Sequence, residues 1–186
     1  MQSKPTPIPA LSVVPRPTFV VGTDTEVGKT YQACRLVQAL GRAGKSVGVY
    51  KPVLSGVVDG AGESGEHGSD DGSLLLQASG QRWPFARVCP QVFAAPVAPP
   101  VAARLEAKQV DESMLVDGLH WWSGRCDALV VEGAGGVLSP ISETMTILDL
   151  AATSSARIII VAANRLGVVN HTLLTLEAVR SRNLEI

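Results

Sequence analysis

The feature that most constrains the fold is a set of short, mostly apolar segments that run into glycines or polar residues. Residues 18–21 enter Gly22, residues 127–131 end at Glu132, and residues 157–163 form a third such segment. Apolar runs without regular polar alternation are typical of parallel strands buried on both faces. Helical patterns separate these runs along the chain, so the sequence predicts an α/β fold with three layers, α/β/α, around a mainly parallel sheet.

The prolines and glycines divide the rest of the chain. Residues 1–17 carry five prolines and predict a flexible leader, whereas residues 18–186 predict a single domain. Residues 56–72 are rich in Gly, Ser, Asp and Glu and predict a loop. We further expect helices at residues 29–42, 73–78, 110–122, 146–152 and 170–182, strands at residues 46–50 and 87–93, and a proline-rich segment at residues 95–100.

Charge and cysteine content exclude several classes of protein. Sixteen Lys and Arg residues balance seventeen Asp and Glu residues, and the net charge of −1 argues against nucleic acid as a partner. No apolar run approaches the roughly 18 residues that a membrane span requires, so we expect no membrane partner. The three cysteines form no CxxC pair and are odd in number, which favours reduced thiols in a cytoplasmic protein over disulfides or structural zinc.

The nonapeptide GTDTEVGKT follows the first strand and opens a helix, which is where a phosphate-binding loop lies. Backbone N–H groups of such a loop converge on an anion, Gly28 allows close approach, Lys29 contributes a positive charge, and the Thr30 hydroxyl can bind Mg²⁺. The loop is a variant, because the first glycine position of the common pattern holds Thr23 and the glycine is Gly22. The sequence predicts a P-loop NTPase-type, Rossmann-like fold; the alternative is a plain helix start with an exposed lysine.

Charged residues follow other strands of the predicted sheet. Glu132 ends a strand and should face the same crevice as the phosphate loop, where its carboxylate could hold Mg²⁺ or, alternatively, cap a solvated loop. Lys51 follows the strand at residues 46–50; alone it is a solvated charge, but its place at the carboxyl edge favours a role in the site. Asp70 and Asp71 are adjacent, so we expect one ligand at most, and Asp71 also lies where a helix N-cap would be.

Several motifs in order resemble the dethiobiotin synthetase family over residues 18–183. They are GTDTEVGKT, Lys51-Pro52-Val53-Leu54-Ser55-Gly56, Asp71, Val131-Glu132-Gly133-Ala134-Gly135-Gly136 and Leu166-Gly167-Val168-Val169-Asn170-His171. The resemblance implies Lys51 and Lys29 as catalytic residues, and Thr30, Asp71 and Glu132 as ligands of Mg²⁺. It implies that ATP is bound by Glu26, Val27, Gly28, Lys29, Thr30, Tyr31, Asp71, Glu132, Gly133, Ala134 and Gly135. It implies that the substrate is bound by Thr25, Ser55, Val169 and Asn170.

The reaction implied by the resemblance converts 7,8-diaminopelargonic acid, CO₂ and MgATP to dethiobiotin, ADP and phosphate in biotin biosynthesis. The resemblance also implies a homodimer in which Val169 and Asn170 receive the tail carboxylate of the substrate across the interface. The residues alone leave an ordinary turn with Asn170 as N-cap as an alternative. Asp24 is expected near the metal in a supporting role, and the three histidines are assigned no catalytic role.

Other functions share parts of this pattern. A regulatory P-loop ATPase of the partitioning type is the main alternative, but such proteins commonly carry a second lysine early in the loop, where this chain has Thr23, Asp24 and Thr25. An amide-forming enzyme of cobalamin synthesis would need a glutaminase half, and a non-catalytic paralogue would bind without turnover. From the family pattern we also expect residues 18–186 to lack the family's C-terminal strand and adenine-binding segment.

Overall fold

The computed structural model describes residues 16–57 and 70–186. Nearly all of the expected leader at residues 1–17, and most of the expected loop at residues 56–72, lie outside the described residues. The strands are β1 (Thr18–Gly22), β2 (Val47–Tyr50), β3 (Leu54–Ser55), β4 (Val92–Phe93), β5 (Ala128–Gly136) and β6 (Arg157–Val161). The helices are α1 (Lys29–Arg42), α2 (Asp71–Ala78), α3 (Phe85–Val88), α4 (Pro99–Leu105), α5 (Glu112–His120), α6 (Ile147–Ala152) and α7 (Val168–Arg180).

Four strands form the central sheet in the order β2-β5-β1-β6, and every pairing is parallel. The late strand β5 therefore lies between β1 and β2, which are neighbours in sequence. A separate parallel pair joins β3 to β4. The order brings the carboxyl ends of β1, β2 and β5 together, which is the edge where ligands of open α/β sheets bind.

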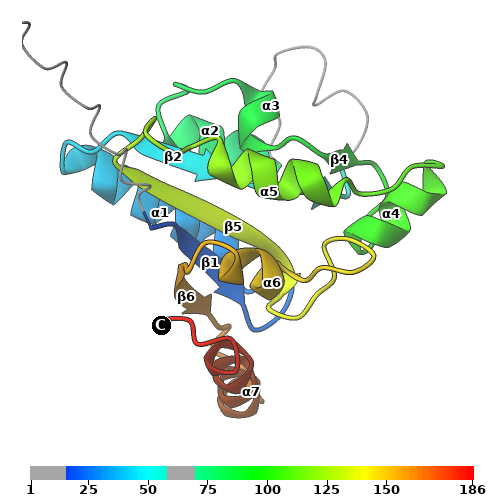
Figure 1. Ribbon diagram of the computed structural model, residues 1–186. Coiled ribbons are helices and arrows are strands. Elements are labelled where there is room, and N and C mark those ends of the chain that lie inside the picture. Colours follow the sequence, from blue (N-terminus) through cyan, green and yellow to red (C-terminus); the bar gives the residue numbers. More distant parts are fainter. Residues whose placement is uncertain (1–15, 58–69) are drawn as a thin grey trace, which may run out of the picture.

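Helices cover both faces of the central sheet, as expected for three layers (Figure 1). On one face, the Tyr50 hydroxyl of β2 donates to the Leu115 carbonyl of α5 at 3.0 Å, and a Cβ on Gly133 would lie 3.0 Å from Ile147 of α6. On the other face, α1 and α2 pack together, and the Thr30 hydroxyl of α1 donates to Glu132. The helix α7 lies at the outer edge of the sheet beside β6.

The core is built mainly from aliphatic side chains of the strands, with a few large aromatics on the α5 face. Phe19, Val49, Val130 and Val131 are fully buried, and so is Trp122, the residue that follows α5 by two positions. The continuous burial of β1 and β2 explains why these segments show no polar alternation in the sequence.

Two segments differ from the sequence predictions. Residues 87–93 are not one strand: the helix α3 ends at Val88 and β4 holds only Val92–Phe93. The proline-rich segment contains the start of a helix, α4, with Pro99 and Pro100 in its first turn. Proline is favoured there because the first N–H groups of a helix have no partner within the helix. The same prolines that suggest irregular structure in the sequence thus begin a regular element.

Two helix starts also differ by a few residues. The N-cap of α2 is Asp70, whose carboxylate accepts from the Ser73 N–H at 3.0 Å, and Asp71 is the first residue of the helix. The helix α7 begins at Val168 after Gly167, which has φ 94°, so Asn170 is not its N-cap. A left-handed φ of this kind is readily adopted by glycine.

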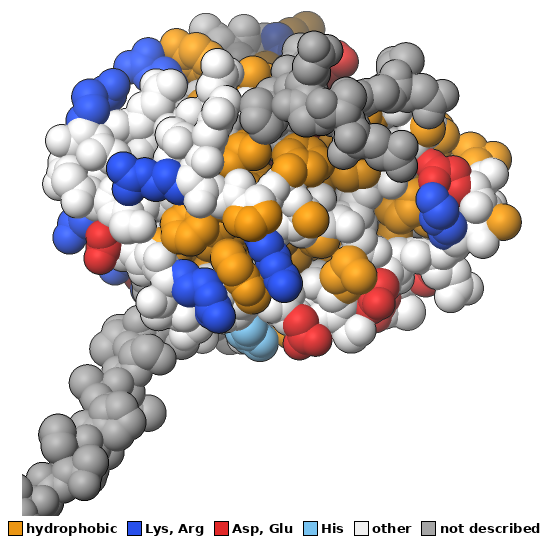
Figure 2. Space-filling model, turned by 90° about the horizontal axis from the view of Figure 1, so that it is seen from above, with side chains coloured by type: hydrophobic (Ala, Val, Ile, Leu, Met, Phe, Trp, Pro, Cys, Tyr) orange, Lys and Arg blue, Asp and Glu red, His pale blue; other side chains and the backbone are white. Residues whose placement is uncertain are grey.

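The molecular surface carries charges of both signs. Figure 2 shows acidic, basic and apolar groups interspersed on the face seen from above.

On the outer side of β6, the Ile158 N–H donates to the Glu185 carbonyl at 2.8 Å, and Glu185 pairs in parallel with Arg157. In the parts of the chain that the structure describes, no helix has the length and apolar character required to cross a membrane.

Candidate active site

The phosphate loop connects β1 to α1 and leaves the helix N-terminus open. Its last residue, Gly28, has φ 94° and is the N-cap of α1, with no side chain to occupy the first N–H groups. The first turn of α1 contains no acidic residue. The Lys29 ammonium donates to the Asp24 carbonyl at 2.9 Å and so lies inside the curve of the loop. These features provide N–H groups and a positive charge for a phosphate.

Gly22 is required by close packing in this loop. A Cβ at this position would lie 2.6 Å from the Asp24 carbonyl oxygen and 3.0 Å from the Lys29 nitrogen. The backbone carbonyl cannot move without reshaping the loop. The glycine that appears one position early in the sequence therefore makes room for the contact between Lys29 and Asp24.

Four side chains meet at the carboxyl edge of the sheet. The Lys51 ammonium, directly after β2, lies 2.7 Å from Asp71 Oδ2 and 2.8 Å from Glu132 Oε1. It also donates to the Gly133 carbonyl at 3.2 Å. The Thr30 hydroxyl shares its proton between Asp71 Oδ1 at 2.7 Å and Glu132 Oε1 at 2.8 Å. One ammonium and one hydroxyl thus hold two carboxylates together.

Two of these three charges are buried, and the third is partly exposed. The side chain of Lys51 is 3% exposed and that of Glu132 is 0% exposed, whereas Asp71 is 37% exposed. The possibility that Lys51 is a solvated surface charge is therefore wrong, and so is the possibility that Glu132 caps a solvated loop. Burying a charge without a partner is costly, and these two compensate each other.

Burial and pairing shift the pKa values of the cluster in different directions. Burial would lower the pKa of Lys51, but the Glu132 and Asp71 carboxylates raise it above its usual range. Burial raises the pKa of Glu132 despite the Lys51 charge. Burial also acts to raise the pKa of Asp71, but the charge and hydrogen bond of Lys51 hold it below its usual range. Burial and the nearby Lys51 charge lower the pKa of Lys29.

A cavity of about 400 Å³ lies between the phosphate loop and this cluster. It is lined by Thr25, Glu26, Gly28, Lys29, Thr30, Lys51, Val53, Leu54, Ser55, Asp71, Glu132, Ala134 and Gly135. Val53 and Leu54 are the lining residues that the sequence did not indicate as part of a site. Their position directly after the predicted strand and Lys51-Pro52 was the available signal, but apolar side chains carry no chemical signature.

The oxygen atoms of the cluster fit a magnesium ion. Mg²⁺ prefers oxygen ligands and is commonly held by one or two carboxylates together with substrate phosphates. Thr30, Asp71 and Glu132 offer two carboxylates and a hydroxyl, and Glu132 Oε2 is buried with no hydrogen-bond partner among the described residues. In residues 16–57 and 70–186, no group of three or more His, Cys, Asp or Glu side chains gathers as a metal site, so the donor set stays at two carboxylates.

Several predicted site residues lie outside this cavity. Val27 is buried beneath the loop, and Gly133 contributes its carbonyl to Lys51. Tyr31 is exposed and its hydroxyl accepts from Arg35 at 3.0 Å. Val169 and Asn170 lie on the exposed first turn of α7.

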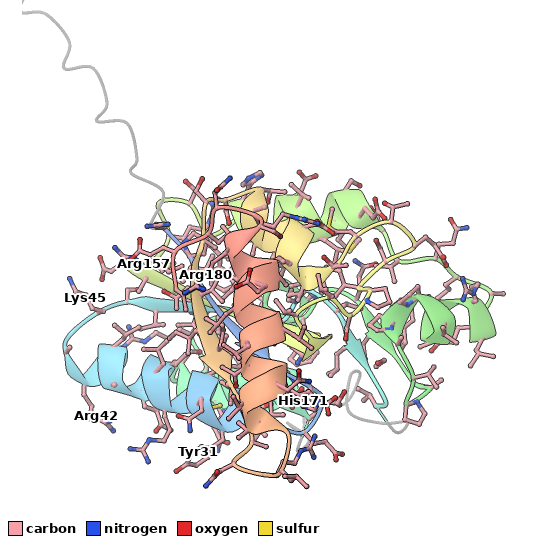
Figure 3. The ribbon with its side chains drawn as sticks, turned by 90° about the horizontal axis from the view of Figure 1, so that it is seen from below. Tyr31, Arg42, Lys45, Arg157, His171 and Arg180 are labelled. Atoms are coloured by element: carbon pink, nitrogen blue, oxygen red, sulfur yellow. The ribbon has the colours of Figure 1, made fainter. Side chains whose placement is uncertain are left out.

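Asp24 was expected near the metal ligands, but its carboxylate makes no hydrogen bond to the cluster of Thr30, Lys51, Asp71 and Glu132. Its carboxylate accepts from Arg165 at 2.7 Å, and it lines a second cavity of about 490 Å³ together with His171 of α7. Figure 3 shows His171 near the start of α7, on the opposite side of the view from Arg42 and Lys45. The sequence could not indicate this position, because the partner of Asp24 is 141 residues away along the chain.

A parallel sheet with a GKT loop after its first strand, a buried lysine and two carboxylates at the same edge defines an α/β protein of the P-loop NTPase type. A family model described as an AAA domain matches residues 16–186. The chain is 43% identical over 171 residues to an ATP-dependent dethiobiotin synthetase of Anaeromyxobacter sp. strain Fw109-5, covering 91% of this chain and 73% of that protein. The chain belongs to the dethiobiotin synthetase family.

Other relatives agree with this assignment. A protein of the same name from Anaeromyxobacter dehalogenans strain 2CP-C is 45% identical, covering 92% of this chain and 74% of the relative. The corresponding protein of Rhodopirellula baltica is 42% identical over 178 residues, covering 90% of this chain and 69% of the relative. The solved kinase domain of the Escherichia coli tyrosine kinase ETK matches weakly, with a TM-score of 0.49 and 12% identity over 92% of this chain and 64% of that one.

Proposed function

We propose that this protein is an ATP-dependent dethiobiotin synthetase, which joins 7,8-diaminopelargonic acid to CO₂ and closes the ureido ring of dethiobiotin, with ATP converted to ADP and phosphate. The observation that carries the proposal is the Lys51 ammonium, buried between Asp71 and Glu132 beside a phosphate loop. The names of the relatives support the same activity. In this proposal the protein catalyses the reaction by positioning two substrates and by neutralising developing negative charge.

The reaction divides into three steps. One amine of the diamine attacks CO₂ and loses a proton, which gives a carbamate. A carbamate oxygen then attacks the γ-phosphorus of ATP and ADP leaves, which gives a carbamic–phosphoric anhydride. The second amine attacks the carbamate carbon and loses a proton, phosphate leaves, and the ring is closed.

The residues of the cavity have distinct roles in this scheme. Lys29, from the phosphate loop, binds the β- and γ-phosphates, and Lys51 stabilises the negative charge of the carbamate and of the transferring phosphoryl group. Thr25 and Ser55 line the same cavity and hydrogen-bond the diamine end of the substrate. The Ser55 hydroxyl donates to the Val97 carbonyl at 2.7 Å, so its oxygen is oriented and can accept from an amine.

The proposed metal ion is Mg²⁺, held by Thr30, Asp71 and Glu132. When bound, it supplies positive charge to the phosphate oxygens of ATP. Without it, the Lys51 ammonium is the charge that compensates both carboxylates. The burial of Glu132 keeps water away from one side of the cluster and so strengthens these electrostatic interactions.

We also propose a homodimer and a cytoplasmic location. The turn before α7 and the first half of the helix expose an apolar stripe formed by Leu166, Val169 and Leu173, with exposed fractions of 103%, 69% and 56%. Exposed apolar patches of this kind mark interaction surfaces, and a second copy of the helix can cover the stripe symmetrically. Val169 and Asn170 would then approach the substrate of the partner. The cytoplasmic location is supported by Cys34, Cys89 and Cys126, all of which are free thiols.

The direct test uses the purified protein with the diamine, ¹⁴C-bicarbonate and MgATP. We expect diamine-dependent ADP release and incorporation of label into an acid-stable product, both lost in Lys51→Ala and both retained in Lys45→Ala. Lys45 is an exposed lysine before β2 and provides the matched control. The absence of diamine-dependent ADP release from folded protein would exclude this function. Hydrolysis stimulated by a macromolecular partner, without any effect of the diamine, would favour the partitioning ATPases instead.

A further inference from the structure

Asp24 joins the phosphate loop to a distant segment of the chain through three contacts. Its Oδ1 accepts from the Thr25 N–H at 2.7 Å, its Oδ2 accepts from the Arg165 guanidinium at 2.7 Å, and its carbonyl accepts from the Lys29 ammonium at 2.9 Å. Arg165 lies in the segment between β6 and α7, 141 residues further along the chain. One residue of the loop therefore contacts both its phosphate-binding lysine and the entry to α7.

The loop has little freedom around this residue. The Asp24 carbonyl is packed against Gly22, where not even a Cβ has room. At the start of the loop, the Thr23 N–H donates to the carbonyl of Val161 at the end of β6 at 3.0 Å. Arg165 adds a second connection, which joins the loop to the segment that follows β6. Both connections lie close in sequence to the Asp24 carbonyl that accepts from the Lys29 ammonium.

The pair of Arg165 and Asp24 is poorly suited to stabilising the fold. The two side chains are 56% and 48% exposed. Exposed ion pairs contribute little to stability because water and salt screen them. Its position is more informative than its strength: the Val168 N–H donates to the Arg165 carbonyl at 3.0 Å, so Arg165 also begins the turn into α7, which carries Val169 and Asn170.

We propose that Arg165 is a positioning residue for the reaction: by holding Asp24, it fixes the loop carbonyl that directs the Lys29 amine toward the phosphates of ATP. This inference rests on the proposed function for its kinetic readout, but nucleotide binding tests it independently. The same contact connects the phosphate loop to the turn before α7. It therefore fixes the ATP-binding loop relative to Val169 and Asn170, which are proposed to bind the substrate carboxylate.

The test compares Arg165→Gln, Arg165→Lys, Asp24→Asn and the double variant with the wild type. Asn at position 24 keeps an oxygen for the Thr25 N–H and loses only the charge opposite Arg165. We expect kcat/KM for MgATP to fall about tenfold in Arg165→Gln and in Asp24→Asn, mainly through KM, as expected for a displaced binding group. We expect Arg165→Lys to recover most of the loss, and the double variant to be no worse than either single variant.

The control is Arg104→Gln, because Arg104 pairs with Glu143 at 2.7 Å and the two are similarly exposed, at 56% and 46%, but lie outside both cavities described above. It should leave KM for MgATP unchanged. Calorimetric titration with MgATP in the absence of diamine should show the same tenfold weakening for Arg165→Gln. Equal MgATP affinity in Arg165→Gln, Arg104→Gln and wild type would overturn the inference. Failure of the wild type to turn over the diamine would instead count against the proposed function and leave the binding comparison valid.

Discussion

The cavity behind the phosphate loop and the outer surface of α7 depart from the usual distribution of residues in opposite ways. In the cavity, charged side chains are buried, with Lys51 and Glu132 almost fully removed from solvent. On α7 and the turn before it, apolar side chains are exposed, and Leu166 in that turn is fully exposed. Buried charges and contiguous exposed apolar groups are the two informative exceptions to the rule that apolar residues lie inside.

The two regions differ in whether other residues of the chain offset the unfavourable burial or exposure. The charges of the cavity are compensated within the chain, because Lys51 pairs with Asp71 and Glu132 and the Thr30 hydroxyl donates to both, which leaves only Glu132 Oε2 in this cluster without a partner among the described residues. The stripe of Leu166, Val169 and Leu173 has no such compensation within residues 16–57 and 70–186. The first arrangement indicates a site for small charged ligands, and the second indicates a surface for another macromolecule.

The largest effect is expected from removal of the charge of Lys51. Lys51→Met keeps the apolar stem and deletes the ammonium, so Glu132 loses its partner. We expect ADP release to fall at least about 100-fold, because the charge that stabilises the transferring group is lost. We also expect the free energy of unfolding at pH 8 to fall by about 3–5 kcal/mol, measured by urea denaturation.

The stability of this variant should depend on pH in a defined direction. Burial already raises the pKa of Glu132 above its usual value, and loss of Lys51 raises it further. The folded state then binds more protons than the unfolded state above about pH 4.3, so stability falls as the pH rises through the folded pKa. The destabilisation should therefore be smaller at pH 5 than at pH 8. An equal loss at both pH values would contradict the assignment of the effect to Glu132.

The next effect concerns the exposed stripe on α7. Leu173→Glu places a charge at the C-terminal end of the stripe, and we expect the dimer dissociation constant to rise at least about 100-fold because a charge would be buried without a partner. Sedimentation velocity over a range of concentrations measures this change. The control is Glu177→Gln, one turn further along the helix and also exposed. A wild type that remains monomeric at high concentration would refute the homodimer.

A smaller effect is expected when one carboxylate of the cavity is neutralised. Asp71→Asn keeps the shape of the side chain and removes a charged ligand of the proposed metal ion. We expect the Mg²⁺ concentration for half-maximal ADP release to rise about tenfold or more. Asp70→Asn is the matched control, because Asp70 caps α2. Equal Mg²⁺ requirements in the two variants would remove Asp71 from the metal site.

The smallest effect is expected for an exposed ion pair remote from the cavity and from the stripe. Arg182 lies 2.9 Å from Asp149, and the two side chains are 43% and 34% exposed. Arg182→Gln should change the free energy of unfolding by less than about 1 kcal/mol and leave turnover unchanged. Urea denaturation and the ADP assay measure both quantities. A larger loss of stability or turnover would show that distance from the cavity and the stripe does not predict which charged residues matter in this protein.

The sequence indicated the cavity better than it indicated the surrounding elements. Lys51 and Glu132 each follow an apolar strand, and parallel strands bring their carboxyl ends to one edge, so their meeting could be predicted from the pattern. The choice between Asp70 and Asp71 could not be made from the residues alone, because adjacent positions differ only in where the helix begins. In the structure Asp70 caps α2, which directs Asp71 toward Lys51.

Other features depend on contacts that are distant in sequence. The helix α4 was not predicted because a proline-rich segment resembles a loop until the position of the first turn is known. The contact between Asp24 and Arg165 spans 141 residues and involves two loops, which have no periodicity that could reveal it. Loop geometry is fixed by neighbouring elements, and therefore local sequence is a weak guide to it.

The place of β5 in the sheet has a consequence for the order of assembly. β1 and β2 are synthesised first, yet each pairs with β5 and not with the other. A growing chain on the ribosome therefore cannot pair β1 and β2 into one sheet until β5, which begins at residue 128, has emerged. Long-range pairing of this kind is slow. Glu132 arrives with that strand, so Lys51 has no buried carboxylate partner from β5 before then. Capture of ATP by a nascent chain would thus report that the central strand has been inserted.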